Sequence, residues 1–486
     1  MPDSAAPRPN IVFIMSDDHA SHAMSCYGSR INTTPNLDRI ANEGMRLDNC
    51  FCTNGICTPS RAAILTGTYN HVNKVTTLAT HLDNRMTTFP GLLRESGYQT
   101  AVFGKWHLGM GPDHCPRDFD DWAVLPGQGL YHNPDFIFKN DDGGETRTVT
   151  GYVTDLITDF SLDWLKQRDP DKPFCLLYHH KAPHRSWEPD EKHAHMYLNE
   201  VIPEPETLYD DYSERAAAAK AATMRIGLDM NTQDIKRAIN KKLPEMELRK
   251  WAYQHYIKDY LRVVASIDDN VGRVLDYLDE AGLSENTIVV YTSDQGFFLG
   301  DHGWYDKRFM YEESLRMPFV VRYPREIQAG SVSEDIVTNV DFAPLFLELA
   351  GVDIPEAFQG RSFRRVLHGE APLDWPEAMY YRYWMHAAHH NVAAHYGIRT
   401  KRYKLIYYYF DGCGQEGAIG ATGSDARLAA IHNREPEWEL FDLEADPYEL
   451  RNVYGKSEYA DVVSELTERL HRLQAAIKDE RYVKDA

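Results

Sequence analysis

Short, unbroken apolar runs that end in polar residues recur along most of the chain. Four of them lie at residues 10–16, 100–103, 174–178 and 287–292. Runs of this length and composition are typical of strands buried on both faces, as strands in parallel sheets are. Because ligands in open α/β sheets bind beyond the carboxyl ends of the strands, the polar segment after each run is a candidate site.

Stretches with helical spacing of apolar residues separate these runs. The spacing predicts helices over 34–41, 87–97 and 253–278, and the alanine-rich composition of 216–224 predicts another. Strands that alternate with helices predict an α/β fold, with a large, mostly parallel sheet sandwiched by helices. The portion at about 205–250 interrupts the alternation. We interpret it as a helical insertion, either a solvated excursion or part of the wall of a substrate pocket.

The pattern changes from Trp375 onward. An aromatic, strand-like run at 403–409 precedes an amphipathic helix over 462–478. We therefore predict two domains. Residues 1–374 form the large α/β domain with the insertion, and residues 375–486 form a smaller α+β domain with an antiparallel sheet and a helix.

Charge and composition narrow the classes of partner. The 486-residue chain carries a formal net charge of −21, so neither nucleic acid nor an anionic membrane is expected as a partner. An anionic substrate would have to meet a local cluster of cations. No apolar run is long enough to cross a bilayer, and the first residues lack the basic and apolar regions of a signal peptide. We expect a cytoplasmic protein, or a periplasmic one if a leader was trimmed.

The stretch CTPSRAAILTG at residues 57–67 places a cysteine at the start of a predicted helix. Pro59 suits the first turn of a helix, and Gly67 is a typical helix terminator. Unpaired N–H groups and the helix dipole at the N-terminal end favour an anion. Arg61, four residues after Cys57, faces the same side of the helix. An anionic group beside Cys57 would therefore be held by a fixed cation.

Three kinds of chemistry are consistent with Cys57. A thiolate nucleophile of the phosphatase type needs a loop of backbone amides between the cysteine and the arginine, whereas only three residues intervene here and one is a proline. A buried structural cysteine is the second alternative, because free cysteine behaves as a small hydrophobe. The third is a match to the signature C-x-P-S-R, which the rest of the chain has to support. The odd number of cysteines, seven, favours reduced thiols over a disulfide framework.

Hard oxygen ligands follow two of the predicted strands. Asp17 and Asp18 come directly after the first run, and Asp294 and Gln295 come after the fourth. Adjacent aspartates within a strand point to opposite faces, but at a strand end the chain turns and both can converge. Carboxylate and amide oxygens are the ligands that Ca²⁺ and Mg²⁺ prefer. The sequence therefore predicts a divalent-cation site at the strand ends.

The cluster of cations that an anionic substrate requires can be assembled from four further residues. Lys105 and His107 follow the second run, His184 follows the third, and Lys307 lies shortly after Asp294. Each of these side chains alone is typical of a satisfied polar residue. Together they place positive charge and titratable imidazoles at the same predicted edge of the sheet as the acidic residues.

The order of these motifs resembles the type I, formylglycine-dependent sulfatases of the alkaline-phosphatase superfamily, across nearly the whole chain. The motifs are Asp17-Asp18, Cys57-x-Pro59-Ser60-Arg61, Gly104-Lys105-Trp106-His107, Ala182-Pro183-His184, Asp294-Gln295-Gly296 and Lys307. The resemblance implies an alkaline-phosphatase-like fold. It also implies that a maturation enzyme oxidises Cys57 to formylglycine, whose hydrated aldehyde attacks sulfur and forms a covalent sulfated intermediate.

The same resemblance implies a role for each site residue. One Ca²⁺, in preference to Mg²⁺ or Mn²⁺, would be bound by Asp17, Asp18, Cys57, Asp294 and Gln295. The catalytic set would be Cys57, Arg61, Lys105, His107, His184 and Lys307. In that set, Arg61 and Lys105 orient the nucleophile, and His107 helps to break down the intermediate. His184 and Lys307 contact the sulfate and the leaving oxygen, which needs a general acid because it departs as an alkoxide.

Two positions depart from the pattern of the family. Many members have Asn at the position of Gln295, and phosphonate-hydrolysing relatives have His there. Gln keeps the amide oxygen but carries it one methylene further out, so ligation is preserved in kind while its reach changes. Lys181 stands where a small residue or a histidine is more usual.

The C-terminal part narrows the resemblance to bacterial carbohydrate sulfatases, particularly those that act on 6-sulfated N-acetylglucosamine. The segments that carry this likeness are 395–405 and 438–442. Trp187 and Trp384 are candidates to stack on a sugar, with a core role as the alternative. Four histidines are candidates to line a sugar pocket and are otherwise loop or surface residues: His386, His389, His390 and His395.

We therefore predict an enzyme that hydrolyses a sulfate ester, with a small-molecule or oligosaccharide substrate and a formylglycine-generating enzyme as partners; homo-oligomers are also compatible with the sequence. One alternative is a phosphonate monoester or phosphodiester hydrolase on the same scaffold, which the lack of an export signal favours and Gln295 opposes. A second is a non-enzymatic binder of sulfated glycans, which would have no need of the Cys57 motif.

Overall fold

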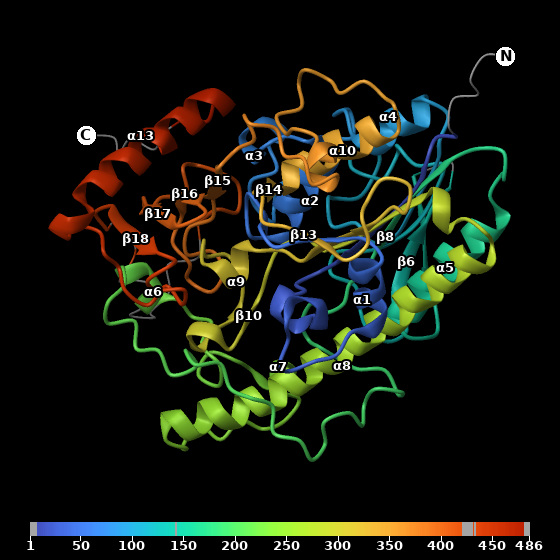
Figure 1. Ribbon diagram of the computed structural model, residues 1–486. Helices are drawn as coiled ribbons and strands as arrows, with labels where there is room; N and C mark the ends of the chain where they lie inside the picture. The colour runs from blue at the N-terminus through green and yellow to red at the C-terminus, as the bar shows by residue number, and fades with distance from the viewer. Residues whose placement is uncertain (1–6, 141–142, 420–430, 432–433, 481–486) are drawn as a thin grey trace.

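A ten-stranded sheet runs through the larger part of the molecule, with strand order β13-β2-β12-β9-β1-β8-β4-β5-β6-β7 (Figure 1). The computed structural model describes residues 7–140, 143–419, 431 and 434–480. The strands are β1 (Asn10–Ser16), β2 (Met45–Leu47), β4 (Gln99–Lys105), β5 (Asp121–Leu125), β6 (Asp135–Phe138), β7 (Glu145–Thr148), β8 (Phe174–His179), β9 (Thr287–Ser293), β12 (Phe319–Arg322) and β13 (Ser331–Ser333). The centre of the sheet is parallel, because β1 pairs in parallel with β8 and β9, and β4 pairs in parallel with β5 and β8. Both arms carry antiparallel pairs. The predicted mostly parallel sheet is confirmed.

Helices cover both faces of this sheet. Those of the large part are α1 (Pro35–Asn42), α2 (Cys57–Thr66), α3 (Asn70–Asn73), α4 (Phe89–Glu95), α5 (Val153–Gln167), α6 (Ala217–Ala221), α7 (Thr232–Ile235), α8 (Glu245–Glu280), α9 (Glu312–Leu315), α10 (Phe342–Leu349) and α11 (Arg364–Leu367). Helices α1, α5 and α8 pack together, and α2, α4 and α10 form a second group. Figure 1 shows the two groups on opposite sides of the sheet. The predicted sandwich of helices is therefore present.

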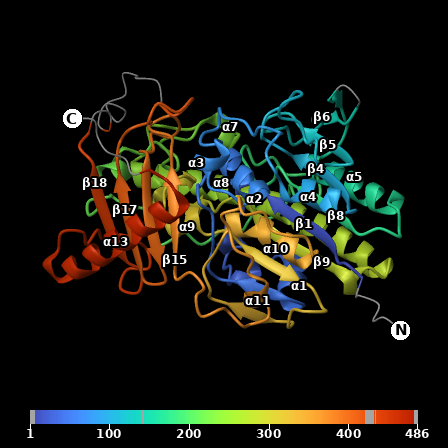
Figure 2. The same ribbon diagram turned by 90° about the horizontal axis from the view of Figure 1, so that it is seen from above.

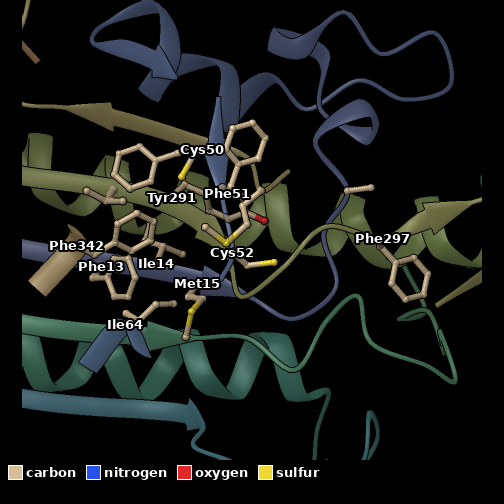
Figure 3. Close-up of a cluster of buried hydrophobic side chains, with 14 of the residues drawn as sticks. Phe13, Ile14, Met15, Cys50, Phe51, Cys52, Ile64, Tyr291, Phe297 and Phe342 are labelled. Carbon is tan, nitrogen blue, oxygen red and sulfur yellow. The ribbon is translucent and has the colours of Figure 1, made fainter. Parts of the chain in front are cut away.

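The core explains why the first apolar run has no polar interruption. All seven residues of β1 are buried, because helices cover the side chains that point to either face of the sheet. Phe13 packs edge-on against Phe342 and Phe346 of α10, with ring centroids 6.2 and 5.2 Å apart. Figure 3 shows Phe13 and Phe342 in this cluster, with Ile64 of α2 beside them. Burying one such side chain contributes about 2 kcal/mol.

The C-terminal part forms a separate antiparallel sheet, which lies to one side of the large sheet (Figures 1 and 2). Its strands are β15 (Ala378–Tyr383), β16 (His395–Thr400), β17 (Tyr403–Tyr408) and β18 (Glu437–Asp442), and α13 (Ala460–Ile477) packs on it. It has its own small core, to which Leu405, Leu440 and Leu466 contribute. The predicted antiparallel sheet with a closing helix is confirmed, whereas a domain boundary at residue 374 stays a prediction.

Two pairs of short strands complete the sheet structure of the described residues. Strands β10 (Phe298–Leu299) and β11 (Tyr305–Asp306) are antiparallel, and β3 (Cys50–Phe51) pairs in parallel with β14 (Val337–Thr338). Among the helices that the structure describes, none is both long and apolar enough to cross a membrane.

The predicted insertion is less helical than its composition indicates. Residues 205–244, all of which the structure describes, contain only the short helices α6 and α7, and α8 begins at Glu245. The predicted helix over 216–224 is wrong beyond Ala221, because the following backbone pairs with distant segments instead. Thr223 donates its N–H to the carbonyl of His390, and Met224 accepts from the N–H of Tyr305. Tertiary hydrogen bonds here override the helical propensity of alanine.

Candidate active site

The carboxyl ends of four adjacent strands, β9, β1, β8 and β4, deliver the predicted site residues to one edge of the sheet. Asp17 and Asp18 follow β1, Asp294 follows β9, and Lys105 is the last residue of β4. Asp18 adopts a left-handed backbone conformation, with φ +72°. Its N–H donates to Asp294 Oδ1 at 3.3 Å and its carbonyl accepts from the hydroxyl of Tyr260 at 2.8 Å. This turn lets both adjacent aspartates reach the same site.

Three buried carboxylates form the acidic centre of the site. Asp17, Asp18 and Asp294 are at most 1% exposed, and each places a carboxylate oxygen within 4.8 Å of the other two. Asp17 Oδ1 and Gln295 Oε1 are buried and accept no hydrogen bond from any residue that the structure describes. Oxygen atoms that lack a donor are suited to a hard divalent cation. The residues present therefore fit the metal site that the sequence predicts.

Burial and mutual repulsion of these carboxylates shift their pKa values. Burial, reinforced by the two neighbouring carboxylates, raises the pKa of Asp18 to about 7 although Lys307 opposes the shift. Burial and Asp17 raise the pKa of Asp294 to about 6. For Asp17, burial also favours the neutral form, but Lys105 and further cations hold its pKa well below the usual value. A divalent cation in this position would keep all three groups ionised.

Each carboxylate is paired with one cation from a different segment. The ammonium of Lys105 donates to Asp17, and Lys307 Nζ donates to both oxygens of Asp18 at 2.6 and 2.7 Å. Arg61 Nε donates to Asp294 Oδ2 at 2.9 Å. These contacts bring together the cations that the acidic chain requires for an anionic substrate.

Arg61 also retains a donor for a further group. Its Nη1 donates to the carbonyl of Lys105 at 2.7 Å, whereas its Nη2 is buried and has no hydrogen-bond partner among the described residues. Arg61 itself is 2% exposed. A buried guanidinium nitrogen without an acceptor fits an anion that binds beside the metal site.

Cys57 begins α2 and lies against this cluster. Its Sγ, a carboxylate oxygen of Asp17 and a ring nitrogen of His184 lie within 4.8 Å of one another. Burial raises the pKa of the Cys57 thiol to about 12, although Lys105 and Lys307 oppose the shift. The unmodified side chain is therefore a neutral thiol at neutral pH, which argues against the thiolate chemistry of a cysteine phosphatase.

The first turn of α2 is fixed to the strand end that carries Asp294. The hydroxyl of Ser60 donates to the carbonyl of Asp294, and Asn339 Nδ2 donates to Ser60 Oγ at 2.8 Å. The helix ends at Gly67, whose φ of +60° is the left-handed conformation of a helix terminator. These bonds explain why a serine stands next to Arg61 in the motif.

The two candidate histidines come from the segments that follow β4 and β8. His107 Nδ1 is 3.3 Å from Thr58 Oγ1, and His184 Nδ1 is 2.9 Å from the carbonyl of Arg185. The second contact makes Nδ1 the protonated nitrogen of neutral His184, so that Nε2 faces Asp18 Oδ2 at 3.9 Å. Burial, with Lys105 as a further cause, lowers the pKa of both imidazoles well below the usual value, although Asp17 opposes the shift.

Sequence reasoning missed three residues that support these groups. Gln128, in the loop after β5, accepts from the ammonium of Lys105 at 2.5 Å. Lys181 is 2% exposed, lies 4.4 Å from the ring centroid of Tyr131 and donates to the Arg185 carbonyl at 3.2 Å. The hydroxyl of Tyr131 donates to the carbonyl of His184. Lys181 was visible as a departure from the family pattern, but no local signal marks Gln128 or Tyr131.

Lys181 and His184 share one acceptor, the carbonyl oxygen of Arg185. Burial, with Lys105 as a further cause, lowers the pKa of the Lys181 ammonium to about 8. Because the ammonium and the imidazole converge on the same oxygen, Lys181 fixes the loop that presents His184. We regard it as a positioning residue.

The candidates for a sugar pocket separate into interior and peripheral residues. Trp187 is fully buried against Tyr256, with ring centroids 4.7 Å apart, so the prediction of sugar stacking by Trp187 is wrong. His395 is likewise fully buried in β16, where Nε2 accepts from the N–H of Met310 at 3.2 Å. Trp384 is 8% exposed and lies under the guanidinium of Arg382 at 3.7 Å. None of these three rings is available to a sugar.

Of the three remaining candidate histidines, two lie close to the charged residues at 306–308. His390 Nε2 is 3.3 Å from Asp306 Oδ2, and His389 is exposed. His386 is buried, and its Nδ1 accepts from the N–H of Ala394 at 3.4 Å. Of the four histidines, His389 and His390 thus keep positions compatible with the edge of a substrate pocket.

The pattern of the family described as Sulfatase matches residues 9–352, which is more than half of the chain and includes all of the candidate metal ligands and catalytic residues. The chain belongs to the sulfatase family. It is therefore a sulfuric ester hydrolase, as the motif order predicts. A second family pattern, described as N-sulphoglucosamine sulphohydrolase, C-terminal, matches residues 300–416 and 418–476.

Individual relatives agree with this assignment. An N-acetylglucosamine-6-O-sulfatase of Bacteroides thetaiotaomicron is 44% identical over 97% of this chain and 87% of its own length. A solved structure in complex with its substrate D-glucosamine-2-N,6-O-disulfate has a TM-score of 0.87 and 43% identity, covering 97% of this chain and 99% of that one. A phosphonate monoester hydrolase from Silicibacter pomeroyi has a TM-score of 0.72 over 97% of this chain and 96% of that one, but its 20% identity shows a common fold alone.

Proposed function

We propose that this sulfatase hydrolyses a sulfate ester on a carbohydrate, with 6-sulfated N-acetylglucosamine as the substrate and position 57, oxidised to formylglycine, as the nucleophile. The observation that carries the proposal is the arrangement around Cys57. There, three basic side chains each pair with one of three aspartates. Asp17 Oδ1 and Gln295 Oε1, which could bind a metal, and Arg61 Nη2, which could bind an anion, have no partner among the described residues. The N-acetylglucosamine-6-O-sulfatase that is 44% identical to this chain supports the choice of sugar and position.

The metal of this proposal is one Ca²⁺. Asp17, Asp18, Asp294 and Gln295 would hold it, with position 57 next to Asp17 as a further ligand. When bound, such a cation neutralises the buried carboxylates and polarises an oxygen of the sulfate. The donor set is composed of oxygens, which favours Ca²⁺ or Mg²⁺ over softer metals.

The side chains of this protein divide the remaining work. The formylglycine would supply a hydroxyl that attacks sulfur, and Cys57 Sγ marks its place in the unmodified chain. Lys105, Lys307 and Arg61 surround that place with positive charge, which would hold the sulfate and orient the hydroxyl. The cleaved bond is then S–O, and the alcohol leaves unchanged.

The histidines are the candidates for proton transfer. His184 turns Nε2 toward Asp18 and the site, where it would face the leaving oxygen and protonate it. His107 adjoins Thr58, the residue after the nucleophile, and would act on position 57 itself. An anionic substrate raises the pKa of a nearby imidazole, which offsets the effect of burial on both groups.

Mass spectrometry of the peptide that contains Cys57 tests the nucleophile. The protein would be produced together with a formylglycine-generating enzyme, and we expect loss of the sulfur and appearance of an aldehyde. An unmodified thiol under these conditions would leave the catalytic scheme without its nucleophile and would contradict the proposal.

Turnover of matched esters tests the reaction class. We expect release of sulfate from 4-nitrophenyl sulfate and from N-acetylglucosamine 6-sulfate, with little release of nitrophenol from 4-nitrophenyl phenylphosphonate. A clear preference for the phosphonate would instead favour the phosphonate monoester hydrolase alternative, whose fold this chain shares. If sulfate is released from 4-nitrophenyl sulfate but not from N-acetylglucosamine 6-sulfate, the proposed sugar substrate is wrong, while the proposed sulfate ester hydrolysis stands.

A further inference from the structure

A cavity of about 490 Å³ lies between the large sheet region and the C-terminal sheet. Its walls come from three segments of the large part and from the C-terminal sheet region. The lining residues are Ser21, His22, Arg30, Asp301, Glu312, Glu313, Arg316, Arg399, Lys401, Leu443, Glu444, Pro447 and Tyr448. Figures 1 and 2 show α9 between these two parts of the molecule. The candidate metal ligands and catalytic residues are absent from its lining, so the cavity is separate from the candidate active site.

Three of the four carboxylates that line the cavity lie beside a basic side chain. Glu312 lies 3.1 Å from Arg399 Nη2 and 2.9 Å from Lys404 Nζ. Asp301 lies 3.2 Å from His22. Glu444 lies 3.4 Å from Arg402. Glu313 is the exception, because its Oε2 lies 3.4 Å from His302 but is buried and has no hydrogen-bond partner among the described residues. Most of the negative charge of the lining is therefore compensated within the protein.

The cations of the lining, in contrast, keep unused donors. Arg399 is 5% exposed and directs Nε and Nη2 to Glu312, but its Nη1 is buried and has no hydrogen-bond partner among the described residues. Arg316 is half-buried, and Arg30 and Lys401 are exposed. The side chains of these three make no hydrogen bond or ion pair within the part of the chain that the structure describes. Four cations thus share one cavity in a protein whose net charge is −21.

We propose that this cavity binds a sulfate or carboxylate group, and that a saccharide carries it. A guanidinium group matches the oxygens of such an anion with two parallel donors. Arg399, whose Nη1 lacks an acceptor, belongs to the lining together with Arg30, Arg316 and Lys401. Tyr448, 42% exposed at the cavity, offers an aromatic face to the sugar ring. The claim that a saccharide carries the anion rests on the proposed function, whereas the claim that the cavity binds an anion does not.

Calorimetric titration of the Cys57→Ala protein tests the site without turnover. The probes are inorganic sulfate and a disaccharide that combines N-acetylglucosamine 6-sulfate with a uronic acid. For the disaccharide we expect two binding events, of which the double variant Arg316→Ala/Lys401→Ala loses one and leaves the other within twofold. If inorganic sulfate binds the second site with the same affinity as the disaccharide, the proposal that a saccharide carries the anion is wrong, and the cavity is a site for the free anion.

A matched control separates this local effect from a loss of general positive charge. Arg85→Ala also removes an exposed arginine, with a side chain 82% exposed beside Asp83, and we expect it to leave both binding events intact. Unchanged binding in the double variant, or an equal loss in Arg85→Ala, would overturn the proposal. Because binding and not hydrolysis is measured, a titration that shows the second event without the first would contradict the proposed function and keep the anion site.

Discussion

Two networks of buried acidic and basic side chains differ in the kind of atom that they leave without a partner. At the edge of the large sheet, Lys105, Lys307 and Arg61 pair with three aspartates, yet Asp17 Oδ1 and Gln295 Oε1 lack donors. Unpaired acceptors in a buried site fit a cation. The donor of Arg61 that remains there fits the anionic substrate next to it.

The second network lies beside the cavity between the two sheets. Lys404 donates to Glu449 at 2.6 Å and lies 2.9 Å from Glu312, which also accepts from Arg399. All of the carboxylates named have a cation, and the atom left over is a guanidinium nitrogen. The comparison teaches that the buried polar atoms without a hydrogen-bond partner, rather than the net charge, indicate which ligand a buried charge network binds. It also separates the network of the candidate active site from one that joins two parts of the chain.

Replacement of Cys57 by alanine should have the largest effect. We expect turnover of 4-nitrophenyl sulfate to fall by about 10⁴-fold or more, because the proposed nucleophile is removed while the surrounding charges stay. The matched control is Cys52→Ala, which removes a fully buried cysteine from the neighbouring segment. Steady-state kinetics of both variants provide the measurement, and turnover that survives in Cys57→Ala contradicts the role of position 57.

Asp294→Asn should abolish the response to metal. A bound cation supplies several kcal/mol to catalysis, so we expect a loss of about 4 kcal/mol in transition-state stabilisation, about a thousandfold. In the unsubstituted protein stripped with a chelator, Ca²⁺ at a hundred times its Kd should stabilise the fold by about 2.7 kcal/mol. Thermal unfolding with and without Ca²⁺ measures this. An unchanged shift in Asp294→Asn would place the metal elsewhere.

Glu312→Gln should break the second network in a different way. Arg399 would keep a buried charge without its carboxylate, which costs about 3 kcal/mol of unfolding free energy. Urea denaturation measures the loss, with Glu444→Gln, whose side chain is 69% exposed, as a control expected to change stability by about 0.5 kcal/mol or less. The Ca²⁺ response of Glu312→Gln should remain, and its disappearance would show that the two networks are coupled.

Lys181→Met should have the smallest of the four effects and should act through His184. We expect kcat to fall about tenfold with KM within about twofold, since the imidazole loses part of its support but the sulfate contacts remain. The loss should be larger for N-acetylglucosamine 6-sulfate than for 4-nitrophenyl sulfate, because nitrophenolate needs less help from an acid as it leaves.

An exposed lysine provides the control for that variant. Lys192→Met removes a side chain that is 69% exposed and should leave both substrates unaffected. If kcat of Lys181→Met falls equally for the two esters, Lys181 stabilises the loop in general and does not specifically position His184.

The site could be predicted from the sequence where local signals were strong. Asp17, Asp294 and Lys105 each follow or end an apolar run, and a buried parallel strand places its carboxyl end at the site edge whatever the rest of the chain does. Cys57 and Arg61 belong to one helix, so their common face follows from helical geometry. Gln128 was not identified from the sequence, because a glutamine in a loop carries no such signal.

Burial was the property that sequence reasoning could not assign. Trp187 and His395 had the composition of sugar-binding residues, yet both are enclosed by the protein. Residues 222–224 had helical propensity, yet their backbone pairs with His390 and Tyr305. In each case the partner lies far away in the chain, and no pattern around the residue itself reports it.

The amino-acid sequence by itself determined the alternation of strands and helices, the family of the enzyme and the residues that meet at the strand ends, because these depend on periodicity and on motifs within a few residues. Only the tertiary structure decided which buried atoms lack a partner, which aromatic rings remain accessible and that a second group of cations encloses a cavity. Those properties depend on desolvation and on contacts between segments hundreds of residues apart, so they exist only once the chain has folded.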